Sequence, residues 1–183
     1  MTSQRTKRLT FAATVLMTLL AGARAGFAGD EDLIRDARQT VADFRRTDPG
    51  LDEFLRRSAG YVVFPGIGKG GYVVGGAHGT GVLFERGVPV GKVKLNQVSV
   101  GAQIGGQEFS EVMFLETPSN LADFKQGKLK VEAEASAVAI NKGAAAHARF
   151  KNGIAIFTHI KGGAMAEASV GGQKFSYQPF SAR

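Results

Sequence analysis

The chain has 183 residues, a formal net charge of +7 and no cysteine. This length suits one domain of ordinary size and is short for two. Without cysteine the chain has no disulfide framework, no thiolate metal site and no thiol nucleophile.

The first 28 residues have the three parts of a secretory signal peptide. Basic residues precede an apolar run over residues 9–20, and small residues permit cleavage after Ala25 or Ala28. The apolar run is shorter than the roughly 20 residues that a membrane-spanning helix needs. We therefore expect cleavage to leave one secreted domain over residues 29–183, periplasmic in a bacterium, with peripheral membrane association possible.

Cleavage would change the charge of the mature chain. The segment up to Ala25 carries four bases and no acid, so its removal lowers the formal net charge to +3. Residues 30–58 then carry −2, and residues 59–183 carry +5. A net +3 does not indicate a nucleic-acid binder. The distribution predicts an acidic helical arm on a basic, glycine-rich body.

The N-terminal part of the mature chain has the pattern of two helices. Residues 30–46 place apolar side chains at helical spacing, with acids in the first turn. Asp48 and Pro49 then resemble the N-cap and the first residue of a second, short helix that ends near Gly60.

From Tyr61 onward the apolar period changes to two, which predicts strands. One short helix interrupts them, with Thr117 as its N-cap, Pro118 as its first residue, and Leu121 and Phe124 facing inward. These elements predict an α+β fold, a glycine-rich antiparallel β-barrel or sandwich preceded by an N-terminal helical hairpin. The predicted strands cover residues 61–64, 72–74, 81–84, 90–95, 98–104, 109–115, 131–139, 145–150, 154–158, 164–170 and 174–177.

Residues 64–81 read FPGIGKGGYVVGGAHGTG and contain a G-x-G-x-x-G motif. In a dinucleotide-binding fold a helix begins inside that motif and directs its amides at the pyrophosphate. Here the next eight residues include three glycines, each of which costs a helix about 1 kcal/mol relative to alanine. A P-loop is also missing, because no G-K-[S/T] occurs. We therefore predict no nucleotide site and assign the glycines to strand bends and close backbone approach.

The residues that usually carry catalysis are scattered. His78 is expected in a glycine turn, His147 in a strand and His159 at a strand end, with no close metal-ligand spacing among them. No serine lies in a G-x-S-x-G elbow. Glu132 and Glu134 share one predicted strand face, which is typical of an exposed polar surface. The sequence therefore predicts a non-catalytic protein without a metal or cofactor.

Four lysines are the candidate binding residues. Lys92 and Lys94 share one strand face, while Lys69 and Lys161 occupy equivalent Lys-Gly-Gly turns. If they converge at one rim of the domain, they can hold an anionic headgroup, with glycine amides as further donors. The alternative is that they are solubilising lysines on the outer face of a sheet.

Three segments carry a resemblance to a known family. They read GYVVFPGIGKGGYVVGGAHGTGVL, VSVGAQIGGQ and VEAEASAVAI, and they resemble the SYLF domain. This domain is shared by the yeast YSC-type actin-binding proteins, an SH3-containing animal protein and many exported bacterial proteins. The resemblance covers residues 30–177 and implies phospholipid binding through a basic surface, which makes the four lysines candidates for headgroup contact.

The chain also departs from the eukaryotic members of that family. It has no tryptophan, and its N-terminal helix opens on three acids, whereas interfacial helices favour basic polar faces. We therefore carry over neither phosphoinositide specificity nor actin binding. The expected partner is an anionic phospholipid or membrane surface, with no nucleic acid or nucleotide and with no protein partner identified. Two alternatives are a structural or protein-interaction module of the cell envelope without a lipid site, and a carrier of an apolar ligand.

Overall fold

The computed structural model divides into two compact units, residues 1–33 and 34–183, and the sheet and the sites below belong to the second. The signal-peptide prediction and the predicted strand over 164–170 lie outside the described residues, as does most of 131–136. The residues that the structure describes are 29–71, 74–100, 105–129, 131, 137–162 and 172–181.

The two N-terminal helices form as predicted. Residues 29–47 are helical, and α2 (Leu51–Arg57) follows after a short turn. The N-cap of α2 is Gly50, so the prediction that Asp48 is the N-cap is wrong. Asp48 is instead buried between two segments. Its Oδ1 accepts a hydrogen bond from the Gly50 amide at 3.0 Å, and its Oδ2 accepts one from the Ala145 amide at 2.7 Å.

The Ala145 amide belongs to α4 (Ala144–His147), which corrects the predicted strand over 145–150. The alternating pattern in that segment is misleading because three consecutive alanines favour a helical turn. The carboxylate of Asp48 also satisfies one of the unpaired amides that every helix N-terminus leaves. A residue far away in the chain therefore stabilises α4.

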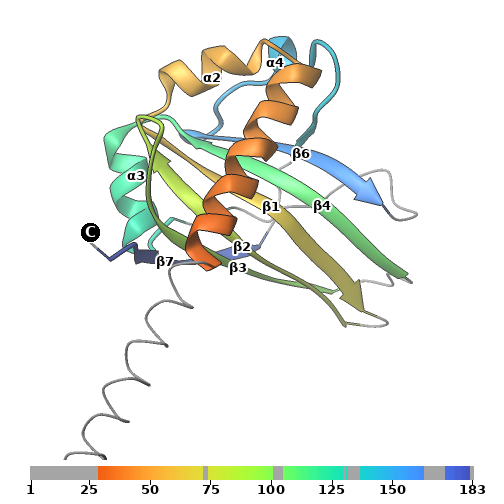
Figure 1. The fold of residues 1–183 in the computed structure, drawn as a ribbon. Helices are drawn as coiled ribbons and strands as arrows, with labels where there is room; N and C mark the ends of the chain where they lie inside the picture. The colour runs from red at the N-terminus through yellow and green to blue at the C-terminus, as the bar shows by residue number, and fades with distance from the viewer. Residues whose placement is uncertain are drawn as a thin grey trace, which may run out of the picture. The chain divides into compact units, whose positions relative to one another are not determined.

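The strands form one seven-stranded sheet with the order β5-β6-β4-β1-β2-β3-β7 (Figure 1). All neighbouring strands are antiparallel except β5 and β6, which are parallel. The α+β class is confirmed, but in the described part of the chain the sheet is not a closed barrel, because β5 and β7 are its two edges. The strand bounds are β1 Gly60–Gly71, β2 Val74–Glu85, β3 Val88–Val100, β4 Gly105–Leu115, β5 Val138–Ala139, β6 Ile154–Gly162 and β7 Gln173–Pro179.

The glycine-rich stretch forms two paired strands, β1 and β2, so its G-x-G-x-x-G motif lies within a strand. A Cβ atom on Gly81 would meet the backbone oxygen of Val63 and would lie 2.6 Å from Cδ1 of Phe64. Glycine is therefore needed there for close approach of the strands, as predicted. Pro65 lies where the pairing register of β1 shifts, which is where a strand tolerates a residue without an N–H group.

The short helix between β4 and β6 is α3 (Pro118–Lys125), and it forms as predicted. Its N-cap is Thr117, whose Oγ1 accepts a hydrogen bond from the Asn120 amide at 3.2 Å. Leu121 and Phe124 are buried, which confirms their predicted inward orientation.

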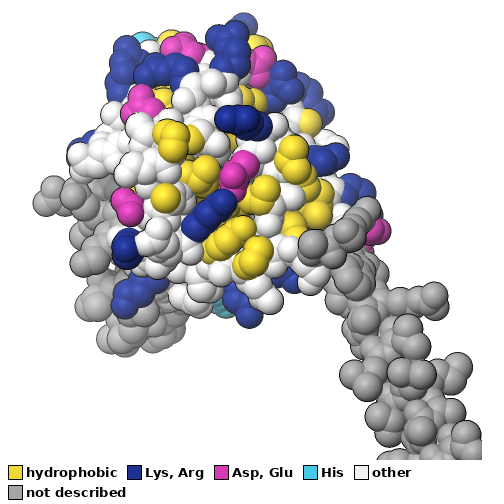
Figure 2. Space-filling model, turned by 90° about the vertical axis from the view of Figure 1, so that its left-hand side faces the viewer, with side chains coloured by type: hydrophobic (Ala, Val, Ile, Leu, Met, Phe, Trp, Pro, Cys, Tyr) yellow, Lys and Arg dark blue, Asp and Glu magenta, His cyan; other side chains and the backbone are white. Residues whose placement is uncertain are grey.

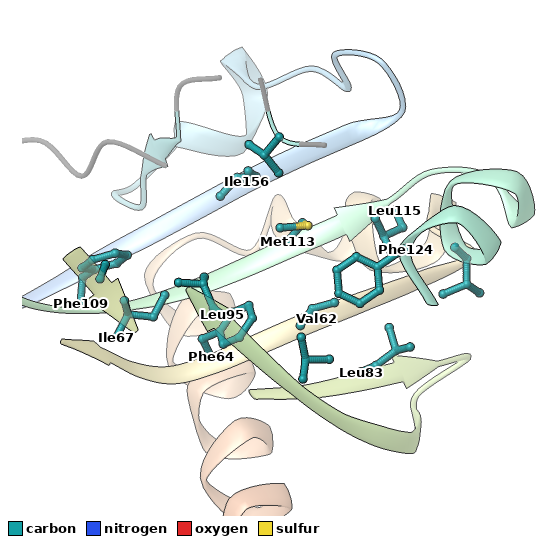
Figure 3. Close-up of a cluster of buried hydrophobic side chains, with 14 residues drawn as sticks. Val62, Phe64, Ile67, Leu83, Leu95, Phe109, Met113, Leu115, Phe124 and Ile156 are labelled. Carbon is teal, nitrogen blue, oxygen red and sulfur yellow. The ribbon is translucent and has the colours of Figure 1, made fainter. Parts of the chain in front are cut away.

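The two faces of the sheet are covered differently. We call the face that carries Val62, Leu83 and Leu95 the inner face; its side chains form the main hydrophobic core with α3 (Figure 3). β7 lies across this core, because the ring of Phe175 is 5.3 Å from that of Phe124 and 6.1 Å from that of Phe64 on β1. The sheet is therefore strongly curled.

The opposite, outer face is partly covered by the helical hairpin. The ring of Phe54 on α2 lies 5.7 Å from Phe114 and 5.0 Å from Phe157. Phe44 of the preceding helix is buried, with its ring 6.1 Å from that of His159 on β6. On the outer face of β3 and β7 the side chains of Lys94, Asn96 and Lys174 are exposed.

Candidate functional site

The outer face of β3 carries two of the predicted site residues. Lys94 is exposed and Lys92 is half-buried. Val93, between the two lysines, and Leu95, directly after Lys94, are buried in the inner face. Successive side chains of a strand point to opposite faces, so the alternation from residue 92 to residue 97 fixes both lysines on the outer side. The prediction that Lys92 and Lys94 share one face is confirmed.

β7 adds a third lysine to the same face. Lys94 is paired with Ser176, and Asn96 is paired with Lys174, which is exposed. Directly paired residues point to the same side of a sheet, so Lys174 lies on the outer face diagonal to Lys94, about 7 Å away. We call Lys92, Lys94 and Lys174 the lysine strip.

The sequence analysis missed Lys174 because its register with β3 is a long-range property. The predicted strand over 174–177 was correct, but nothing in the sequence says which strand it joins or which residues it faces. The signal that was available is weaker: both strands alternate polar with apolar side chains, and Lys174 is one of the polar residues of β7.

No acid lies at the positions paired with the lysine strip, and Lys92 faces the buried, apolar Val82 of β2. Lys94 also faces Thr80 of β2, Asn96 faces His78, and Lys92 faces Gln178. Within the described part of the chain, neither Lys94 nor Lys174 forms an ion pair. At a separation of about 7 Å in water, two such charges repel by only about 0.6 kcal/mol, so their mutual repulsion is a small obstacle to both contacting one anionic surface.

The other two predicted lysines lie elsewhere on the sheet. Lys161 is on β6, four strands from β3, or about 19 Å at the usual strand spacing. Its Nζ lies 3.8 Å from Oε1 of Glu108. Lys69 is on β1, where its backbone is paired with Ala77 and Gln107. Both lysines lie within strands, so the prediction that they occupy Lys-Gly-Gly turns is wrong. Lys161 does not share a rim with Lys92 and Lys94. Contact of the four lysines with a headgroup stays a prediction.

Lys and Arg side chains also gather toward α2 and α4, at the top of the view in Figure 2. Several of these arginines are already paired with carboxylates. Arg45 Nε lies 2.5 Å from Asp52, and Arg57 contacts both Glu53 and Glu116 at 3.3 and 3.0 Å. Because these charges are partly neutralised within the protein, this end is a weaker candidate for an anion than the lysine strip.

Glu111 is a buried acid that the sequence analysis also missed. It lies in the middle of β4 on the inner face, fully buried, and its Oε2 accepts a hydrogen bond from Nε2 of Gln173 at 3.0 Å. Burial raises the pKa of Glu111 to about 7, and the hydrogen bond from Gln173 partly opposes this shift. In the sequence Glu111 looks like one polar residue among the apolar residues of a strand, with no signal that it is buried.

The three histidines lie on three different elements. His78 is in β2 and His147 in α4, which corrects the predicted turn and strand, and His159 is in β6 as expected. In the described ranges no three or more His, Asp or Glu side chains gather as they would around a metal ion. Nor does any helix in those ranges have the length and apolar character needed to cross a membrane.

Comparison with known protein families gives a match over the C-terminal part of the chain. The family model Ysc84, described as Las17-binding protein actin regulator, matches residues 96–179. This span contains the end of β3 and all the described elements from β4 to β7. This is the family that the sequence resembles, and the match confirms the resemblance over residues 96–179. The first of the three similar segments, residues 60–83, lies outside the matched span. No curated protein matches the chain.

Proposed function

We propose that this chain, whose residues 96–179 belong to the SYLF (Ysc84) domain family, binds anionic phospholipid headgroups through the lysine strip on the outer face of β3 and β7. The observation that carries the proposal is the placement of Lys94 and Lys174 on one exposed face without an acid at the paired positions. Lys161 is less favoured as a headgroup contact, because it lies beside Glu108 and four strands from β3.

The binding of the lysine strip to a membrane surface is expected to be weak and salt-sensitive. A lysine near an anionic membrane surface contributes about 1 kcal/mol. Two such contributions correspond to about a 30-fold change in affinity, since 1.4 kcal/mol is about tenfold. Exposed charges are screened over about 8 Å at physiological ionic strength, so added salt should weaken the binding.

The proposal includes the export of the chain and a non-catalytic role. The signal-like pattern of residues 1–28 supports secretion, and a lipid surface facing the periplasm would then be the target. The absence of a nucleophile–base motif from the sequence supports a binding role without chemistry.

Co-sedimentation with vesicles tests the proposal. The purified protein should be enriched on phosphatidylglycerol or cardiolipin vesicles at low salt, and not on phosphatidylcholine vesicles. The double variant Lys94→Gln/Lys174→Gln should bind about 30-fold more weakly. The double variant Lys128→Gln/Lys142→Gln is the matched control, because it removes two exposed charges elsewhere. No enrichment on anionic vesicles would refute lipid binding, and equal losses in both variants would refute the role of the strip.

A further inference from the structure

A polar groove of about 660 Å³ lies between the helix over residues 34–47 and the outer face of β1, β4 and β6. This volume is within the usual range of about 300–1,000 Å³ for sites of small ligands. The groove is separate from the lysine strip, which lies on β3 and β7. Its lining residues are Asp36, Gln39, Thr40, Asp43, Phe44, Arg46, Thr47, Pro65, Gly66, Glu108, Ser110, His159 and Lys161.

Local geometry explains why the groove is open. The helix lines it with Asp36, Thr40, Asp43 and Thr47, which recur every three or four residues and therefore share one side of the helix. The floor is at Gly66, next to the register shift of β1, and has no side chain there. A Cβ atom on Gly66 would already lie 3.3 Å from Oε1 of Glu108. Glycine thus keeps the base of the groove free beside that carboxylate.

The groove carries both signs of charge, contributed by different elements. Its carboxylates are Asp36 and Asp43 on the helix and Glu108 on β4, and its bases are Arg46 and Lys161. Arg46 is engaged with Asp43 in a close ion pair on the helix itself. Asp36 Oδ1 lies 3.8 Å from Nε of Arg35 on the same helix, which is beyond hydrogen-bond distance. The groups outside a close ion pair are therefore Asp36, Glu108 and Lys161.

The pair of Lys161 and Glu108 is the loosest in the groove. Their nearest charged atoms are 3.8 Å apart, which is beyond hydrogen-bond distance. The side chains of Lys161 and Glu108 are 44% and 61% exposed. Both groups therefore keep most of their hydrogen-bonding capacity, the lysine as a donor and the carboxylate as an acceptor.

A ligand with a single charge fits this arrangement poorly. An anion near Lys161 would be repelled by the nearby Glu108 and by Asp36, and a cation near Glu108 would be repelled by Lys161. A ligand that carries both charges avoids both costs. We propose that this groove binds a small zwitterion, a primary ammonium joined to a phosphate or carboxylate, with the ammonium at Glu108 and Asp36 and the acidic group at Lys161.

Such a zwitterion exists both as a free metabolite and as the headgroup of a lipid. The first experiment is an NMR titration of the ¹⁵N-labelled protein with O-phosphoethanolamine, with ethanolamine and inorganic phosphate as single-charge probes. We expect saturable shifts of the amides of Gly66, Ser110 and His159, and at least about tenfold weaker binding of each single-charge probe. Equal binding of phosphate, or no saturable shift at these amides, would overturn the proposal.

Variants test the assigned roles of the two charged groups. Glu108→Gln and Lys161→Gln should each weaken O-phosphoethanolamine binding by about tenfold or more, because each removes one of the two complementary charges. Lys151→Gln, an exposed charge outside the groove, should leave it unchanged. Unchanged affinity in Glu108→Gln or Lys161→Gln would contradict the proposal, and the amide spectra of both variants report whether the fold is intact.

Lipid nanodiscs separate the two sources of the zwitterion. If the ligand is a lipid, phosphatidylethanolamine in nanodiscs should shift the groove amides, and phosphatidylcholine should not, because its quaternary ammonium has no N–H donor. If the ligand is a free metabolite, O-phosphoethanolamine should shift the groove amides and phosphatidylethanolamine in nanodiscs should not. The lysine strip is tested with phosphatidylglycerol, so a failure of the groove proposal and a failure of the proposed function are distinguishable.

Discussion

The buried carboxyl of Glu111 should make the stability of this protein depend on pH in an unusual direction. In the folded state its pKa is raised from 4.5 to about 7 by burial. Between these two values the folded protein holds a proton on Glu111 that the unfolded chain has released. Stability therefore falls as pH rises, by about 1.4 kcal/mol per pH unit for one such proton. The contribution is complete below pH 4.5 and is lost as pH rises through about 7.

The substitution Glu111→Gln isolates this effect. Glutamine is similar in size, keeps an oxygen that can accept the hydrogen bond from Gln173, and does not titrate. The folded pKa exceeds the unfolded one by about 2.5 units, which corresponds to about 3 kcal/mol. We therefore expect the variant to gain stability relative to the original protein as pH rises, and to be about 3 kcal/mol more stable at pH 8 than the low-pH difference alone would predict.

Urea unfolding of both proteins at several pH values from about 4 to about 8.5 measures this difference. Other titrating groups are common to both proteins, so their contributions cancel when the two free energies of unfolding are subtracted. The difference should rise between pH 4.5 and 7 and then level off. A difference that stays constant over this range would refute the reasoning, because it would mean that Glu111 titrates at the same pH in the folded and unfolded states.

Two further predictions concern the fold. Asp48→Ala should lower the free energy of unfolding by about 1–3 kcal/mol in urea, because it leaves the amide of Ala145 buried without a partner; no loss would mean that the amide finds another acceptor. Gly81→Ala should destabilise the protein by about 1–3 kcal/mol or prevent folding, because its Cβ atom would lie 2.6 Å from Phe64. The control Gly68→Ala, whose Cβ atom meets nothing within 4 Å, should be nearly neutral, and equal losses in both would show that backbone freedom decides instead.

Local signals in the sequence predicted the elements whose stability is local. α3 was predicted from Thr117 and Pro118 because a capped helix start is encoded in neighbouring residues. Most of the strands were predicted from their alternation, and the glycine-rich stretch was assigned to strands because glycine is unfavourable in a helix. The segment over 145–150 was predicted wrongly for two reasons: its alanines favour a helical turn, and that turn is also stabilised by Asp48, 97 residues earlier.

The features of the candidate site also fall into those that the sequence predicts and those that depend on the tertiary structure. That Lys92 and Lys94 share a face follows from the period of one strand, and the sequence alone establishes it. That Lys174 joins them, that Lys161 lies four strands away beside Glu108, and that Glu111 is buried with a raised pKa depend on strand order, register and curling of the sheet. These are long-range properties, because pairing between strands is set by packing of the whole core, and no local pattern in the sequence records it.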